Sequence, residues 1–251
     1  MSDKLLQQRH GPVLQLSLNR PQKKNAIDNE LWIALREAFK AAAADDSVRC
    51  VVLHGAGDNF SAGVDLSSFG DSGEGEHPFE SAARAVADFD KPLIAAAHGV
   101  AVGGGATVLF HADMVYAGDS LRLRLPFAAL ALPPEWASSY MLQANIGAQR
   151  AAELFYSADW IDAARAVELG MALEVVPDTE LLQRALARAA AVARWPLSGL
   201  REIKRCLRLP HRAAIDAAFH AEQAAMMRQA GSAENIEAVM AIMEKREPRF
   251  D

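Results

Sequence analysis

Residues 94–106 restrict the fold of this chain more than any other segment, because nearly every side chain in them is small. The apolar run 94–97 has the length of one buried strand. The glycines 103–105 follow it and predict the start of an apolar helix that extends to about Phe110. The first N–H groups of a helix have no partner within it, and glycine leaves them open to a negatively charged ligand. The segment therefore predicts a strand, a turn and a helix N-terminus that can receive an anion.

A second small-residue segment, 60–66, follows an apolar run at 50–53 that predicts a short buried strand. If the two segments face each other, their backbone N–H groups form an oxyanion hole, which is a pair of donors for a developing negative charge. Two tight turns with close packing of strand on helix are the alternative interpretation of the same residues. A nucleotide site is less well supported, since 103–105 lacks the G-x-G-x-x-G spacing and no Gly-Lys-Ser/Thr follows it.

Strand and helix patterns alternate through the first two-thirds of the chain, as in an α/β fold. Residues 13–18 alternate in polarity and predict a strand, and 114–117 predict another. Asp28 is a suitable N-cap for a helix over 29–44, in which apolar residues recur every four positions. The acidic and glycine-containing stretch 69–78 predicts a mobile surface loop.

The sequence changes character after Pro134, where nearly every segment has a helical pattern and one short strand candidate remains at 172–176. The predicted helices are rich in alanine and lie near 179–194, 198–209, 212–227 and 233–247. Several of them have wide apolar stripes, so we expect them to pack on the core or on another subunit. This pattern divides the chain into a core, 1–195, and a helical C-terminal oligomerisation region, 196–251.

The composition excludes several classes of function. The net charge of −6 contains no long block of one sign, so the basic footprint of a nucleic-acid-binding protein is absent. Cys50 and Cys206 lie far apart, which predicts two buried thiols and no disulfide framework or zinc site. No apolar run is long enough to span a membrane, 1–10 lacks the features of a signal peptide, and 248–251 is not a peroxisomal address. We expect a cytoplasmic protein without a metal site.

Several short motifs occur in an order that resembles the crotonase (enoyl-CoA hydratase/isomerase) superfamily over essentially the whole chain. The motifs are Asn19-Arg20-Pro21, Lys24-Asn25-Ala26, Phe60-Ser61-Ala62-Gly63, Lys91-Pro92 with 93–99, Gly103-Gly104-Gly105, Ala112-Asp113 and the ending 244–250. The resemblance implies a spiral of β-β-α units followed by a helical C-terminal trimerisation region. It also implies acyl-CoA substrates, in which coenzyme A is part of the substrate and not a separate cofactor, and a homotrimer or a dimer of trimers.

The same resemblance implies a location for the substrate. The thioester oxygen is expected between the N–H groups of Val64 and Gly104. The residues expected to line the path of coenzyme A are Ser61, Ala62, Gly63, Asp65, Leu66 and Gly103. For Asp65, holding the turn is an alternative role. Lys245 and Arg246 either face solvent at a helix end or contact the coenzyme A phosphates of a neighbouring subunit.

The residues at the catalytic positions distinguish members of this superfamily. Hydratases of the family use two glutamates, and the matching positions here are Thr107 and Phe127, which cannot act as a general acid or base. Residues 126–140 resemble the peroxisomal-type Δ3,Δ2-enoyl-CoA isomerases, in which a glutamate at the position of Glu135 is the single acid and base. Trp136 departs from that group, which usually has glycine there, and could narrow the acyl pocket. Without the resemblance, Glu135 is interpreted as a charge in the first turn of a helix.

The reaction expected from the resemblance needs one carboxylate. A 3-enoyl thioester loses its C2 proton, the resulting dienolate carries its charge on oxygen, and the same carboxylic acid returns the proton at C4. An apolar pocket, here expected from Leu130, Leu132, Trp136 and Phe127, raises the pKa of such a base. Two alternatives stay open. One is another crotonase reaction of the hydratase, thioesterase, decarboxylase or dehalogenase type, and the other is an acyl-CoA-binding protein without catalysis.

Overall fold

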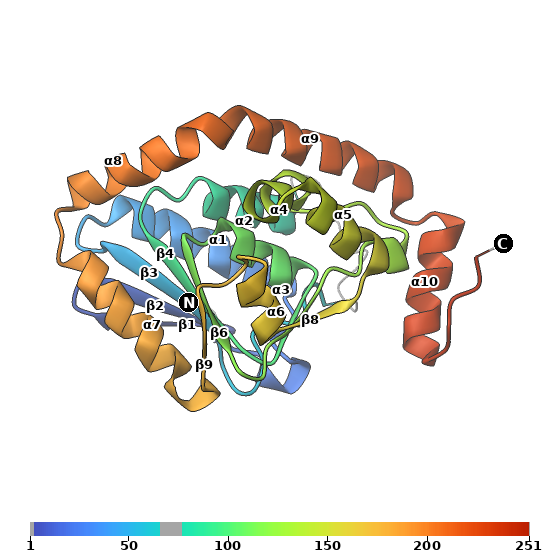
Figure 1. Ribbon diagram of the computed structural model, residues 1–251, viewed down its shortest axis with the longest axis horizontal. Helices are drawn as coiled ribbons and strands as arrows, with labels where there is room; N and C mark the ends of the chain where they lie inside the picture. Colours follow the sequence, from blue (N-terminus) through green and yellow to red (C-terminus); the bar gives the residue numbers. More distant parts are fainter. Residues whose placement is uncertain (1–2, 66–76, 251) are drawn as a thin grey trace.

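The structure is a computed structural model that describes residues 3–65 and 77–250. In this part of the chain, a six-stranded sheet has the order β1-β2-β3-β4-β6-β9 (Figure 1). Its strands are β1 (Leu5–His10), β2 (Val13–Leu18), β3 (Cys50–Gly55), β4 (Leu93–Ala97), β6 (Met114–Gly118) and β9 (Glu174–Val176). All neighbours are parallel except β1 and β2, which form an antiparallel hairpin.

A smaller sheet creates the spiral. Within the described residues it has the order β5-β7-β8, with β5 (Val100–Val102), β7 (Arg122–Arg124) and β8 (Trp160–Asp162). The chain passes from β4 to β5, back to β6 and again to β7, so these four strands alternate between the two sheets. After β5 comes the short helix α3 (Gly104–Thr107), which completes a β-β-α unit. The predicted spiral of β-β-α units is confirmed.

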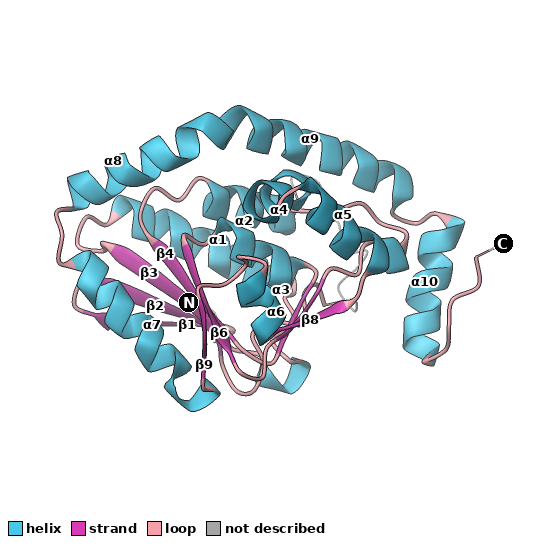
Figure 2. Ribbon diagram, viewed as in Figure 1, coloured by secondary structure: helices cyan, strands magenta, loops and turns pink. Residues whose placement is uncertain are grey.

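Helices cover both faces of the large sheet (Figure 2). On one face, α1 (Asn29–Ala44) and α2 (Pro78–Ala87) pack in the main hydrophobic core. On the other, α7 (Asp178–Ala193) packs through alanines against residues such as Val52 and Ile94. This second layer explains why all of β2 is buried although its sequence alternates in polarity. The polar side chains of β2, Gln15 and Ser17, bond instead to His54.

The predicted cap of α1 is confirmed, because the Asp28 side chain accepts a hydrogen bond from Leu31 N–H at 3.0 Å. The predicted helix from the glycine run to Phe110 is also present in part. It ends as an α-helix at Thr107 and continues as a 3-10 turn over Val108–His111. Between β7 and β9 lie α4 (Ser138–Ile146), α5 (Ala148–Ser157) and α6 (Ala163–Glu168).

The last three helices are α8 (Leu197–Arg208), α9 (Arg212–Gln229) and α10 (Ala233–Glu244). In Figure 1, α8 and α9 form an arc over the rest of the molecule, and α10 turns down at its end. The arc is joined to the core through Lys204, whose ammonium group donates to the Lys91 carbonyl at 2.7 Å and pairs with Asp113 at 2.9 Å. The division of the chain after residue 195 falls between α7 and α8 and stays a prediction.

Two predictions about the surface are corrected or left open. Cys50 is buried as predicted, but Cys206 is exposed, because it lies on the outer side of α8. The predicted loop 69–78 lies outside the described residues except for its end, where Pro78 begins α2.

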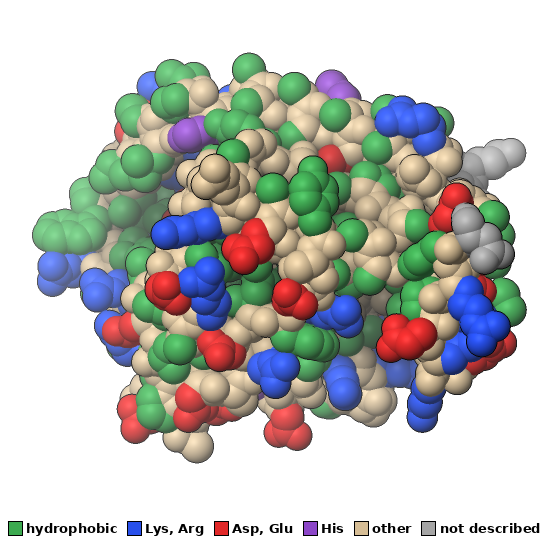
Figure 3. Space-filling model, turned by 45° about the vertical axis from the view of Figure 1, so that its right-hand side comes forward, with side chains coloured by type: hydrophobic (Ala, Val, Ile, Leu, Met, Phe, Trp, Pro, Cys, Tyr) green, Lys and Arg blue, Asp and Glu red, His purple; other side chains and the backbone are tan. Residues whose placement is uncertain are grey.

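Acidic and basic side chains lie next to each other on the face in Figure 3. In the part of the chain that the structure describes, no helix is long and apolar enough to cross a membrane.

Candidate active site

The two small-residue segments run side by side, as the oxyanion-hole hypothesis requires. Ser61 N–H donates to the Val100 carbonyl at 3.0 Å, and Val102 N–H donates to the Ser61 carbonyl at 3.0 Å. These bonds form a parallel bridge between Ser61 and Ala101. The segment after β3 is therefore aligned with the segment that leads into α3.

Glycine is required where the segments touch. Gly63 has φ +85°, and a Cβ on it would lie 2.4 Å from the Val102 carbonyl oxygen and 3.5 Å from the Gly104 nitrogen. A Cβ on Gly105 would lie 2.5 Å from the Ser61 carbonyl oxygen. No side chain fits at such distances, so only glycine lets the two backbones approach this closely.

The N–H groups of Val64 and Gly104 are uncommitted: neither donates a hydrogen bond to any described residue. Gly104 is the first residue of α3, where the helix supplies no partner for it. Gly103, by contrast, donates to the Arg124 carbonyl at 3.1 Å. Two free donors on adjoining backbones can stabilise a negatively charged oxygen.

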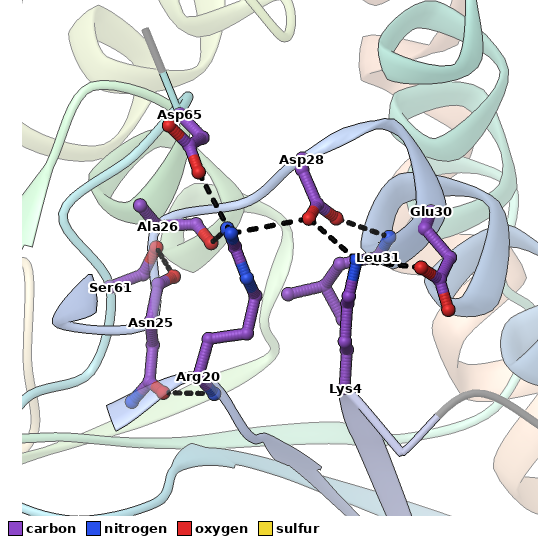
Figure 4. Close-up of polar contacts among 9 residues, drawn as sticks. All are labelled: Lys4, Arg20, Asn25, Ala26, Asp28, Glu30, Leu31, Ser61 and Asp65. Atoms are coloured by element: carbon purple, nitrogen blue, oxygen red, sulfur yellow. Dashed lines mark hydrogen bonds and ion pairs between the residues drawn. The ribbon is translucent and has the colours of Figure 1, made fainter. Parts of the chain in front are cut away.

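A polar network fixes the segment that carries Val64 (Figure 4). The Arg20 guanidinium contacts Asp65 at 2.8 Å and donates to the Ala26 carbonyl. Asn25 has φ +54° and uses its amide to bond the carbonyls of Ala56 and Asn59 at 2.8 Å and 2.7 Å. The Ser61 hydroxyl donates to the Asn25 carbonyl at 2.8 Å. Asp65 and Ser61 thus hold the backbone through their side chains, which gives Asp65 the turn-holding contact that the sequence left as an alternative.

A second ion pair extends this network toward α1. The Lys4 ammonium group lies 2.8 Å from Asp28 and 2.6 Å from Glu30, and Arg20 also reaches Asp28 at 3.3 Å (Figure 4). The residue that caps α1 is therefore tied to the same arginine as Asp65. Strand β1, helix α1 and the segment of Val64 are held in one arrangement.

Glu135 lies beside Gly104 as the isomerase hypothesis requires. Its Oε1 would be 3.3 Å from a Cβ on Gly104, and the Trp32 ring would be equally close to that point. Glu135 is not in the first turn of a helix, because α4 begins only at Ser138. The interpretation as a charge on a helix N-terminus is therefore wrong. The carboxylate accepts no hydrogen bond from a described residue, and burial, followed by the charge of Glu222, raises its pKa to about 8.

Aromatic rings surround this carboxylate. Trp32 lies with its ring centroid 5.6 Å from that of Trp136 and 5.2 Å from that of Phe79. Both tryptophans are about 1% exposed. Of these three rings, only Trp136 is expected in this pocket from the sequence; Trp32 and Phe79 are not. The sequence offers little indication of Trp32, because a tryptophan in an amphipathic helix is more often a core residue than a site residue.

The two positions that carry glutamate in hydratases are apolar or enclosed here. Thr107 is fully buried, and its hydroxyl oxygen has no partner among the described residues. Phe127 is buried against Phe155, with centroids 5.9 Å apart. Leu130 and Leu132 are half-buried on the loop before Glu135. Within 3–65 and 77–250, no cluster of three histidine, cysteine, aspartate or glutamate side chains could hold a metal ion.

The remaining predicted site residues divide by location. Ala62 is half-buried next to Lys24, whose carbonyl accepts its N–H at 2.8 Å. Leu66 lies outside the described residues. Arg246 pairs with Glu237 and Glu244 at the end of α10, so its guanidinium is engaged within its own chain.

Sequence comparison gives the same family over almost the whole chain. The profile of the family described as Enoyl-CoA hydratase/isomerase matches residues 8–251. The 1,2-epoxyphenylacetyl-CoA isomerase of Escherichia coli K12 is 32% identical over 95% of this chain and 94% of its own length. The 2,3-dehydroadipyl-CoA hydratase of the same strain is 31% identical over 98% of both chains. Human enoyl-CoA delta isomerase 2 is 35% identical over 82% of this chain, which spans 54% of that protein.

Structural comparison agrees. A crystal structure of an enoyl-CoA hydratase/isomerase from Pseudoalteromonas atlantica T6c is 34% identical and superposes with a TM-score of 0.96, covering 99% of this chain and 100% of that one. The structure of Pseudomonas aeruginosa OdaA is 32% identical, with a TM-score of 0.92 over 96% and 99% of the two chains.

Proposed function

Because the chain belongs to the enoyl-CoA hydratase/isomerase family, part of the crotonase superfamily, we propose that it is a Δ3,Δ2-enoyl-CoA isomerase. The observation that carries this proposal is a single carboxylate, Glu135, next to Gly104, with Thr107 and Phe127 where a hydratase has its glutamates. Human enoyl-CoA delta isomerase 2, at 35% identity, supports the same activity.

The proposed reaction uses three groups. The thioester oxygen accepts hydrogen bonds from Val64 N–H and Gly104 N–H. Glu135 removes the C2 proton of a 3-enoyl thioester, and the electron pair moves through the C1–C2 bond onto the oxygen. The two N–H groups stabilise this dienolate more than the neutral substrate, which lowers the barrier. Collapse of the dienolate moves the double bond to C2–C3, and the Glu135 carboxylic acid returns the proton to C4.

The raised pKa of Glu135 suits both steps. A carboxylate with a pKa of about 8 is a stronger base than one in water, and its acid form still gives up a proton near neutral pH. Coenzyme A is proposed to pass along Ala62 and Gly63, on the backbone held by Arg20 and Asn25. The proposed assembly is a homotrimer or a dimer of trimers, supported by the exposed apolar side chains Ile236, Met240 and Met243 on α10.

A second candidate substrate carries a ring. The E. coli relative named 1,2-epoxyphenylacetyl-CoA isomerase is similar over the full length, and Trp32, Phe79 and Trp136 surround Glu135. Aromatic rings pack well against a planar acyl group. The same oxyanion hole and the same single carboxylate would serve this substrate.

The test is incubation of the protein with 3-hexenoyl-CoA, with crotonyl-CoA and 1,2-epoxyphenylacetyl-CoA in parallel. We expect the conjugated 2-enoyl product from the first and negligible hydration of the second. Hydration of crotonyl-CoA at a comparable rate would show that proton transfer does not depend on Glu135 alone. Turnover of the epoxide in preference to 3-hexenoyl-CoA would favour the second candidate.

A further inference from the structure

The turn that joins Glu135 to α4 has an unfavourable backbone conformation. Trp136 has φ +60° and Ala137 has φ +53°, so two consecutive residues with side chains are left-handed. Such residues cost free energy and persist only where the surroundings hold them. Contacts from other elements must therefore fix the position of Glu135.

Two side chains supply those contacts. Glu222 of α9 is 5% exposed, and its carboxylate accepts hydrogen bonds from Ala137 N–H at 2.6 Å and Ser139 N–H at 2.8 Å. The His111 Nε2 lies 2.7 Å from the Trp136 carbonyl, which can only accept, so that nitrogen is the donor. Glu222 thus binds the N–H groups on the C-terminal side of the turn, and His111 binds the carbonyl before it.

We propose that Glu222 is a positioning residue for Glu135. Its carboxylate fixes the turn that carries Glu135, and its negative charge acts on the Glu135 carboxylate. The kinetic part of this inference rests on the proposed function, whereas the structural and electrostatic parts do not depend on any substrate.

Electrostatics agree with the geometry. Burial raises the pKa of Glu222, but hydrogen bonds from Ser139 and Ala137 oppose this rise, whereas Glu135 has no such donor. Glu222 therefore ionises first, and its charge is the second cause of the raised Glu135 pKa. Burial lowers the pKa of His111 to about 3, so it is neutral at ordinary pH. Among the charged or titratable groups on and next to α9, Arg84 pairs with Asp216, the Tyr140 hydroxyl bonds His211, and Glu80 accepts from Gln223.

Three variants separate charge from geometry. Glu222→Gln keeps the shape but removes the charge and one acceptor. Glu222→Asp keeps the charge but withdraws it from the two N–H groups. Asp216→Asn is the matched control, because it removes a carboxylate from the same helix without a contact to the turn.

The first measurement is an infrared titration of the Glu135 carboxyl group, obtained as the difference between each protein and the same protein with Glu135→Gln. We expect a midpoint near 8 in the wild type and in Asp216→Asn. In Glu222→Gln the midpoint should fall by about one pH unit, the usual effect of losing a nearby like charge. An unchanged midpoint in Glu222→Gln would overturn the proposal.

The second measurement is the kinetics with 3-hexenoyl-CoA. Glu222→Asp should lower kcat about tenfold or more while KM changes less than about twofold, because a misplaced base slows chemistry without blocking binding. Normal kcat in Glu222→Asp would contradict the positioning role. If the wild type does not turn over 3-hexenoyl-CoA, the proposed function fails while the titration still tests Glu222. Rapid hydrogen exchange of the Ala137 and Ser139 N–H groups in the wild-type protein would overturn the inference without any variant.

Discussion

At the scale of single residues, the site combines two backbone N–H groups that lack an acceptor with a carboxylate that lacks a hydrogen-bond donor, among the described residues. The N–H groups of Val64 and Gly104 donate to no described residue, and Glu135 accepts from none. Polar groups left unpaired in a folded protein cost free energy. Such an arrangement is expected where the missing partners come from a substrate, and in the proposed reaction these are a thioester oxygen and an acidic C–H bond.

Replacing Glu135 tests its role directly. Glu135→Gln should lower kcat for 3-hexenoyl-CoA by at least ~10²-fold, because the amide cannot take up the C2 proton. Steady-state kinetics would measure this loss, with Glu180→Gln on the exposed first turn of α7 as the control. Near wild-type activity in Glu135→Gln would remove the residue from the mechanism.

The pH dependence follows from the pKa of Glu135. The residue must be ionised to act as a base, and its pKa is about 8 in the folded protein. Below that value kcat/KM should rise about tenfold per pH unit, and above it the rate should level. A rate–pH profile with 3-hexenoyl-CoA gives the midpoint, and binding of a saturated acyl-CoA over the same range separates affinity from chemistry. A flat profile between pH 6 and about 9 would contradict the assignment.

At the scale of elements, the site depends on two backbones that approach more closely than side chains allow. Gly63→Ala should disturb this contact, because the position has φ +85° and the new Cβ would meet the Val102 carbonyl at 2.4 Å. We expect a loss of roughly 1–3 kcal/mol in the free energy of unfolding and a fall in kcat.

The control for this variant is Gly199→Ala in α8, where a Cβ would meet nothing within 4 Å. That change should raise the free energy of unfolding by up to about 1 kcal/mol, as alanine favours a helix. Urea unfolding of both variants gives the comparison. Equal effects would show that the close approach at Gly63 has no energetic importance.

Sequence periodicity predicts elements that have one clear pattern. It predicts α1 because apolar residues recur every four positions, β2 because its sequence alternates in polarity, and β4 because it is a short apolar run. It misses β1, which is an edge strand with Leu5 as its one buried residue. It also misses β8, because three residues are too few to show a period. It also misses α2, because the acidic, glycine-containing stretch before this helix suggested one long loop.

The residues of the candidate site also fall into those that the sequence predicts and those that only the fold reveals. Val64, Gly104 and Glu135 follow from the family resemblance, which rests on motifs that are each a short run of residues. Glu222 does not, because its partners Ala137 and Ser139 are more than eighty residues earlier in the chain. Its signal was a charged residue at helical spacing from Ile215 and Ala218, on the inward side of α9. Only the folded chain shows what that carboxylate binds.

At the scale of the whole molecule, the C-terminal helices reach both the surface and the site. The Asn235 amide of α10 donates to the Leu130 carbonyl at 2.8 Å, on the loop that leads to Glu135. The same helix exposes Ile236, Met240 and Met243. One helix thus combines an exposed apolar surface with a contact to the segment that leads to Glu135.

Deletion from Ser232 onward tests this double role. We expect a smaller species than the full-length protein and a higher KM for enoyl-CoA, because the truncation removes both α10 and its contact with Leu130. Light scattering and steady-state kinetics on both proteins provide the measurement. A full-length monomer with normal activity would refute the link between assembly and substrate affinity.

The contact between Glu222 and the turn after Glu135 also sets an order of events during protein synthesis. The carboxylate is added to the growing chain 85 residues after Ala137. While the ribosome is still translating α5 to α8, the turn therefore has no anchor on α9, and of its two holding side chains only His111 is already in the chain. A nascent or prematurely terminated chain can form the two glycine-containing segments before it can fix Glu135 beside them. Glu135 therefore reaches its fixed position only in chains that are almost complete.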